Sequence, residues 1–186
     1  VMADMYPRIL ELAILAKAKG LGFTIDAEEA DRLDISLDIF EKLARAKELQ
    51  DWQGLGIVVQ AYQKRAPYVI DWLKSLGQEL NRKFMVRLVK GAYWDSEIKH
   101  AQEMGLADYP VFTRKPSTDL SYQVCAERLM ADLDVFYPQF ATHNAYSVAL
   151  VLELAAKWNV ATDKFEFQRL HGMGNLLYAV VQASVE

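Results

Sequence analysis

Five short apolar runs, rich in β-branched and aromatic residues, recur along the chain and are separated by longer stretches with helical periodicity. This alternation constrains the fold more than any other feature, because strands that alternate with helices form a parallel sheet covered by helices. The expected strands cover residues 21–26, 55–62, 84–91, 135–142 and 165–170. The expected helices cover residues 6–20, 28–49, 66–80, 94–105, 119–133 and 147–158. The predicted fold class is therefore α/β.

Polar residues follow nearly every expected strand at its C-terminal end. They are Asp26, Gln60, Tyr62, Lys90, Tyr93, Thr142, His143, Asn144 and His171. A (β/α)8 barrel builds its site from the ends of several strands, whereas an open doubly wound sheet binds ligands at one switch point. The usual glycine-rich nucleotide loops are absent after the first strand. We favour a TIM-like barrel. Because eight units need about 250 residues and only five strands are recognisable, residues 1–186 are expected to form a segment of one barrel domain.

Composition excludes several classes of protein. The chain is 52% hydrophobic and 25% charged, as in ordinary globular domains. A net charge of -4 and the lack of a basic run argue against a nucleic-acid surface. A single cysteine, Cys125, excludes an internal disulfide and fits a reducing compartment such as the cytoplasm. No apolar run is long enough to span a membrane, and the N-terminus does not resemble a secretory signal.

Two cations lie within the segment RLVKGAYW at residues 87–94. In a regular strand, Arg87 and Lys90 point to opposite faces. Because a buried, unpaired charge is strongly unfavourable, each cation needs a partner. Arg87 is predicted either to bind a ligand inside the barrel or to pair with a carboxylate of a neighbouring strand, such as Asp26. Gly91 is expected to let another group approach the backbone closely.

Four further positions have both a structural and a functional interpretation. Asp26 either caps the helix that follows it or belongs to a site. Gln60 brings a buried amide whose hydrogen-bonding groups must all be satisfied. Tyr93 and Trp94 are either core aromatics or a wall for a flat ligand.

The histidines and the cysteine are expected to be structural. A metal site formed by His143, His171 and Asp26 is disfavoured because no metal-binding spacing occurs, so no metal is predicted. The two histidines are expected to bond backbone groups at strand ends. His100 is expected on a solvated helix face, and Cys125 is expected to be a small packed hydrophobe.

Two other functions stay open on the pattern alone. A lysine near the end of a barrel strand, here Lys90, is able to form a Schiff base with a carbonyl substrate, as in an aldolase. A folded segment that binds no ligand is the other alternative.

Six stretches of the sequence together resemble the proline dehydrogenase domain of the bacterial, bifunctional Proline utilization A family. They are IDAEEADRLDISLDIFEKL, QAYQKRAP, RLVKGAYWDSEIKHAQ, YPVFTRKPSTDLSY, YPQFATHNA and EFQRLHGMG. The stretches are long, occur in the family's order and cover nearly the whole chain.

The resemblance implies a distorted (β/α)8 barrel that holds non-covalent FAD, with the five strands being the third to the seventh. It implies oxidation of L-proline to 1-pyrroline-5-carboxylate and transfer of the electrons to a membrane quinone. It also implies a cytoplasmic enzyme whose full-length form associates peripherally with the inner membrane.

Site residues follow from the resemblance position by position. Asp26 and Arg87 are the implied catalytic residues, and Asp26, Tyr93 and Leu170 are the implied contacts of the proline substrate. The implied cofactor-binding residues are Ala27, Gln60, Arg87, Val89, Lys90, Gly91, Ala92, Tyr93, Trp94, Thr142, His143 and Asn144.

The sequence departs from the family in what it lacks. The family grips the substrate carboxylate with a paired arginine motif, and no Arg-Arg occurs here. The family's early lysine strand would precede Val1, and its last strand would follow Glu186. The isolated segment is therefore expected to be inactive alone, to bind no nucleic acid, and to self-associate through open sheet edges.

Overall fold

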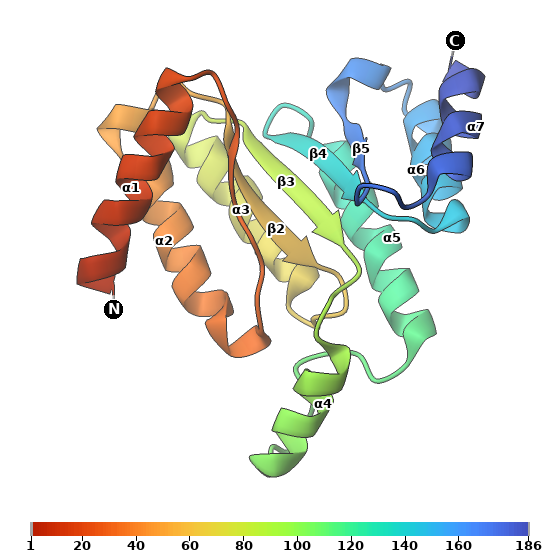
Figure 1. Ribbon diagram of the computed structural model, residues 1–186, viewed down its shortest axis with the longest axis horizontal. Helices are drawn as coiled ribbons and strands as arrows, with labels where there is room; N and C mark the ends of the chain where they lie inside the picture. Colours follow the sequence, from red (N-terminus) through yellow and green to blue (C-terminus); the bar gives the residue numbers. More distant parts are fainter. Residues whose placement is uncertain (1, 186) are drawn as a thin grey trace.

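The strands form one parallel sheet whose spatial order follows the chain, β1-β2-β3-β4-β5 (Figure 1). The computed structural model describes residues 2–185. Its strands are β1 (Phe23–Ile25), β2 (Leu55–Gln60), β3 (Phe84–Val89), β4 (Phe136–Ala141) and β5 (Glu166–Gln168). Its α-helices are α1 (Met2–Ala18), α2 (Leu33–Arg45), α3 (Ala66–Leu80), α4 (Trp94–Glu103), α5 (Lys115–Ala131), α6 (Ala145–Lys157) and α7 (Asn175–Val185). Short 3-10 turns cover Ala30–Arg32, Lys47–Leu49 and Thr162–Lys164.

The strand order favours a barrel over a doubly wound sheet. Every strand pairs with the next one along the chain, so the sheet grows in one direction without a switch point. Because crossovers between parallel strands are right-handed, growth in one direction places successive helices on the same face. Helices α3 and α5 pack against each other and against β2 and β3 in this way. The winding is that of a (β/α)8 barrel segment.

Strand β3 shows how the sheet separates a core from a site. Phe84, Val86 and Leu88 are fully buried and belong to the hydrophobic core under the helices. Met85, Arg87 and Val89 alternate with them and are only partly buried. Since successive side chains of a strand point to opposite faces, Arg87 lies on the face without helices.

The expected strands are all present, and each is shorter than the expected run. The expected helix at 28–49 is interrupted: 3-10 turns flank α2, which buries Ile39, Phe40 and Leu43. Helix α7 was not expected from the sequence. Helix α4 projects beyond the C-terminal end of β3 (Figure 1).

The N-cap interpretation of Asp26 is wrong. Helix α2 begins only at Leu33, after an intervening 3-10 turn. The Asp26 carboxylate instead accepts a hydrogen bond from the N–H of Ala27 at 3.2 Å. The side chain is therefore available for interactions on the face of the sheet that has no helices.

The expectations for Cys125 and His100 are confirmed. Cys125 is fully buried, and burial raises the pKa of its thiol to about 11, which suits a packed hydrophobe. His100 is exposed on α4. Among the helices of residues 2–185, none combines the length and apolar character needed to cross a bilayer.

Candidate active site

A cleft of about 840 Å³ lies where the C-terminal ends of the five strands meet. It collects most of the residues that the sequence singled out. The predicted site residues that line it are Asp26, Ala27, Gln60, Arg87, Val89, Lys90, Gly91, Ala92, Tyr93, Thr142, His143, Asn144 and Leu170. Groups separated by more than a hundred residues in sequence thus share one surface, as in the sites of barrel enzymes.

Trp94 is the predicted site residue that does not line this cleft. It begins α4, and its indole Nε1 donates a hydrogen bond to the carbonyl of Phe112 at 3.0 Å. Trp94 therefore connects α4 to the loop before α5. The alternation of side chains between the two faces of a strand does not extend to Trp94, because the chain leaves the sheet after Val89.

Arg87 makes polar contacts with two other residues of the cleft. Its Nε donates to Oε1 of Gln168 at 2.7 Å, and its Nη1 lies 3.5 Å from Oδ1 of Asp26. The predicted pairing with Asp26 is thus present, although Asp26 follows β1, which β2 separates from β3. The guanidinium has five donors in a fixed fork, so these contacts hold one orientation while leaving other donors for a ligand.

Lys90 has a different environment. Its Nζ donates to Oδ1 of Asp119 at 2.5 Å and lies 5.9 Å from the centre of the Tyr122 ring. Hydrogen bonds from Lys115 and then from Lys90 lower the pKa of Asp119, which keeps a negative charge beside this amine. A Schiff-base lysine needs an amine that is free to attack a carbonyl, whereas the Lys90 amine is held in an ion pair with Asp119. The structure therefore disfavours the aldolase-like alternative.

Gln60 joins two loops at the edge of the cleft. Its Nε2 donates to the carbonyl of Glu28 at 2.7 Å, and its Oε1 accepts from the N–H of Ala92 at 3.1 Å. The Tyr93 hydroxyl adds a third link by donating to the Glu28 carboxylate at 3.1 Å. The buried amide that the sequence left unexplained thus holds the loop after β1 against the loop after β3.

Gly91 is crowded by the protein itself. Its φ is +140°, and a Cβ there would lie 2.3 Å from the ring of Tyr62. The sequence predicted a close approach at this glycine, and the neighbour that makes the approach is a buried tyrosine. Gly91 thus lets the loop of residues 90–94 pack on Tyr62 while it lines the cleft.

Replacing Gly91 with alanine is expected to lower the free energy of unfolding by about 2–3 kcal/mol, because it combines a left-handed conformation with a steric clash. Gly105 is a matched control, since its φ is +62° and nothing lies within 4 Å of the place that a Cβ would occupy. Gly105→Ala is expected to cost about 1 kcal/mol, from the conformation alone. Urea denaturation of both variants measures the difference. Equal losses would show that the Tyr62 contact is unimportant.

The start of helix α6 forms the far end of the cleft. Asn144 caps the helix, because its Oδ1 accepts from the N–H of Ser147 at 3.0 Å. Thr142 Oγ1 accepts from the N–H of Asn144, and His143 Nε2 accepts from the N–H of Leu170 at 3.0 Å. The expected backbone bond of a strand-end histidine is confirmed for His143. The N-terminus of a helix carries a partial positive charge that attracts anions, so this end of the cleft favours negatively charged groups.

The remaining sequence candidates do not form a site. His171 is exposed and does not line the cleft. Within residues 2–185, no three His, Cys, Asp or Glu side chains are grouped so that they are able to hold a metal ion.

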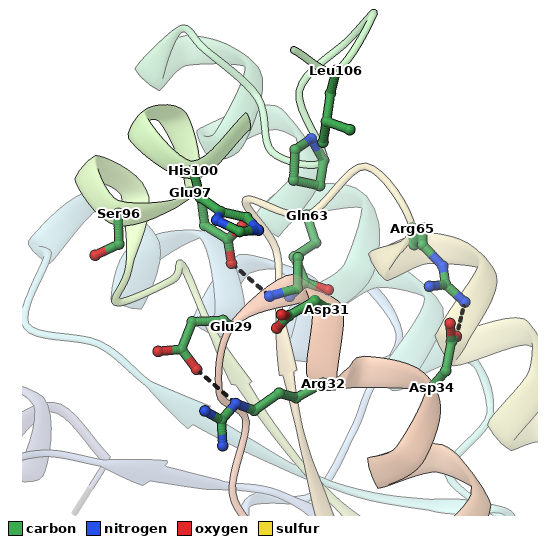
Figure 2. Close-up of a pocket in the computed structure, with 12 residues that line it drawn as sticks. Glu29, Asp31, Arg32, Asp34, Gln63, Arg65, Ser96, Glu97, His100 and Leu106 are labelled. Atoms are coloured by element: carbon green, nitrogen blue, oxygen red, sulfur yellow. Dashed lines mark hydrogen bonds and ion pairs between the residues drawn. The ribbon is translucent and has the colours of Figure 1, made fainter. Parts of the chain in front are cut away.

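A second pocket of about 550 Å³ lies between α4 and the start of α2 (Figure 2). It contains two ion pairs: Arg32 lies 3.2 Å from Glu29, and Arg65 lies 2.6 Å from Asp34. Glu97 accepts a hydrogen bond from the N–H of Ala30. The strand-end cleft is the better candidate for an active site, because it is larger and collects the residues that the sequence predicted.

Comparison with known proteins identifies the family. The sequence profile described as "Proline dehydrogenase" matches residues 1–185. The chain belongs to the proline dehydrogenase family. The predicted resemblance is thus confirmed, and the bifunctional protein PutA of Klebsiella aerogenes is 55% identical over 185 residues. PutA of Escherichia coli is 54% identical, and in both cases the alignment covers all of this chain and 14% of the relative. The chain therefore spans about one seventh of the length of these relatives.

More distant and structural relatives agree with this family. Proline dehydrogenase 2 of Bacillus subtilis is 31% identical over 169 residues, which are 91% of this chain and 48% of that protein. The crystal structure of a PutA variant from Bradyrhizobium japonicum superimposes with a TM-score of 0.94 at 54% identity, covering 99% of this chain and 18% of the other. The expected fold, a segment of a TIM-like barrel, is confirmed.

Five residues line the cleft that sequence reasoning did not select: Glu28, Val58, Ala141, Gln168 and Arg169. The alternation of strand side chains was a usable signal for Val58, because it precedes Gln60 by two positions on β2 and therefore points to the same face. Gln168 carried a weaker signal, as a polar residue inside the short apolar run FEFQRL. Its importance becomes visible only through its contact with Arg87.

Proposed function

We propose that this chain supplies the catalytic cleft of an FAD-dependent proline dehydrogenase. The reaction is oxidation of L-proline to 1-pyrroline-5-carboxylate, with electrons passed on to a quinone. Family membership supports proline as the substrate. The observation that carries the proposal is the convergence of Asp26, Arg87, Tyr93, His143 and Leu170 on one cleft at the strand ends.

The residues present fit a flavin dinucleotide. The cleft has space for a ligand of that kind, since cofactor sites usually occupy about 300–1,000 Å³. One end offers the N-terminus of α6, with Thr142, His143 and Asn144, to a negatively charged pyrophosphate. Strand β3 offers the Arg87 guanidinium to the redox-active ring. Ala27, Gln60, Val89 and the loop from Lys90 to Tyr93 would line the ring as well.

Converting proline to 1-pyrroline-5-carboxylate removes two electrons and two protons from a ring C–N bond. When bound, FAD supplies the electron acceptor for this oxidation. Arg87 contributes a fixed positive charge where negative charge develops, and a preorganised charge stabilises that development. The Asp26 carboxylate, 3.5 Å from the guanidinium, would lie on the substrate side. Tyr93 and Leu170 would pack against the proline ring.

A spectroscopic experiment tests this proposal. The full-length protein that carries this chain is expected to be yellow, to gain thermal stability when FAD is added to the apoprotein, and to lose its visible absorbance when L-proline is added without oxygen. A colourless protein that FAD does not stabilise would overturn the proposal. Stable borohydride labelling of Lys90 would favour the Schiff-base alternative instead.

Further expectations stay predictions. They are quinone as the acceptor, peripheral association with a membrane, inactivity of the isolated segment, and its self-association. The exposed edges of β1 and β5 within the described sheet support self-association, because unpaired strand edges favour pairing between chains.

A further inference from the structure

A chain of hydrogen bonds runs beneath the cleft from Arg87 to the carboxylate of Glu166. Arg87 Nε donates to Oε1 of Gln168 at 2.7 Å, and Gln168 Nε2 donates to Oε1 of Glu166 at 2.7 Å. Gln139 Nε2 also donates to Oε1 of Glu166, at 2.9 Å, and the Tyr137 hydroxyl lies 3.4 Å from its other oxygen. The donors therefore converge on one partly buried carboxylate.

The register of the sheet makes this chain possible. Arg87 pairs with Gln139 across β3 and β4, and Gln139 pairs with Glu166 across β4 and β5. Gln168 lies one pleat further along β5, opposite Ala141. Because Ala141 has only a methyl group, Arg87 is able to reach over β4 to Gln168. All of these side chains occupy the face that lines the cleft.

The chemistry of the neighbours fixes the Gln168 amide in one orientation. A guanidinium only donates hydrogen bonds, and an ionised carboxylate only accepts them. Glu166 therefore requires the NH2 end of Gln168, and Arg87 requires the carbonyl end. Rotating the amide by half a turn would place donor against donor and acceptor against acceptor. The carboxylate of Glu166 thus determines which atom Gln168 presents to Arg87.

We propose that Gln168 is a positioning residue for Arg87, and that Glu166 acts through Gln168 by setting the direction of its amide. The proposal deepens the proposed function and rests on it, because it concerns how the guanidinium is held toward the flavin. Asp26 alone is a weak restraint, since it is 3.5 Å away and its side chain is 75% exposed. Gln168 supplies the shorter contact from the interior side of the cleft.

Exchanging the two residues tests the proposal in the full-length protein. Gln168→Glu places a second carboxylate beside Glu166, and Glu166→Gln removes the acceptor that orients the amide. In the double variant E166Q/Q168E, the carboxylate introduced at position 168 accepts from Arg87. The NH2 group of the amide introduced at position 166 occupies the place of Oε1 of Glu166, where it donates one N–H to that carboxylate. Its other N–H is donated to Oε1 of Gln139, which has no partner in the described structure and faces position 166 once the Gln139 amide turns over. The chain from Arg87 is complete again and the total charge is unchanged, so the two positions are expected to be coupled strongly.

The expected results are set by this coupling. Q168E is expected to raise the dissociation constant of FAD about tenfold and to lower kcat about tenfold. E166Q is expected to change both quantities in the same directions about threefold, as for residues that orient a site. The double variant is expected to return both quantities to within about twofold of wild type. KM for proline is expected to change little in all three, because Arg87 is positioned toward the cofactor. Tyr137→Phe is the matched control, and it is expected to have almost no effect because its bond is long.

Two outcomes overturn the proposal. One is additive losses in E166Q/Q168E. The other is that all the variants lower thermal stability to a similar extent while their FAD affinity and kcat stay at wild-type values. Failure of the proposed function is distinguishable, because wild-type protein would then bind no FAD. In that case the same four proteins still test the positioning chain through their unfolding free energies, and additive losses there again reject it.

Discussion

Replacing Arg87 with methionine is expected to lower kcat/KM for proline about a thousandfold, or about 4 kcal/mol of transition-state stabilisation. The guanidinium is the cation that β3 places on the cleft face, and Gln168 and Asp26 hold it there. Methionine keeps most of the apolar volume and removes the charge, so the loss reports electrostatics rather than packing. Steady-state kinetics of the full-length protein with proline and an artificial electron acceptor measures the effect.

Two variants separate this effect from simpler ones. Arg87→Lys keeps the charge and loses the forked donors, so it is expected to recover only part of the activity. Lys90→Met removes a cation that lies on the same cleft but is bonded to Asp119, and it is expected to cost much less. Equal losses for Lys90→Met and Arg87→Met would contradict the central position assigned to Arg87.

Replacing Arg82 with methionine is expected to lower the free energy of unfolding by about 3–5 kcal/mol. Arg82 is 8% exposed and lies outside the cleft. Its guanidinium donates to the carbonyls of Ala44, Leu49 and Trp52, where the chain leaves α2 and approaches β2. The carbonyls of Ala44 and Trp52 would lose the donor that Arg82 gives them, while that of Leu49 keeps a hydrogen bond from the N–H of Trp52 at 3.3 Å. Leaving buried acceptors unsatisfied is costly.

Urea denaturation of Arg82→Met measures this loss. The matched control is Lys83→Met, which removes one positive charge from the adjacent, less buried position and is expected to change stability by less than about 0.5 kcal/mol. Activity per folded molecule is expected to stay near wild type, because Arg82 touches no residue of the cleft. A small stability change for Arg82→Met would show that water satisfies the carbonyls of Ala44 and Trp52.

The sequence predicts the elements well because the signals are local. Alternation at β3 gave both its position and the cleft-facing side of Arg87. Helical periodicity located α3, α5 and α6 to within four residues, and it overestimated the length of α2. Boundaries were less accurate, since where a strand ends depends on the pairing of its neighbours. The N-cap prediction for Asp26 was wrong for a related reason. Helical periodicity does not predict the 3-10 turn that precedes α2, so α2 begins later than expected.

The site required both local pattern and family resemblance. Polar residues at strand ends indicated one shared surface, and the resemblance selected thirteen residues that do line the cleft. Trp94 was the exception, because α4 turns it toward Phe112. Gly91 was expected to admit a neighbour, and the structure identifies that neighbour as Tyr62.

The sequence by itself determined the order of strands and helices, the polar ends of the strands and the family. These follow from short-range periodicity and from motifs, which do not depend on long-range contacts. Only the tertiary structure decided how the cleft is held together: the Gln60 link between two loops, and the chain from Arg87 through Gln168 to Glu166. Arg87 and Gln168 are 81 residues apart, and no local pattern encodes a contact that reaches across an intervening strand.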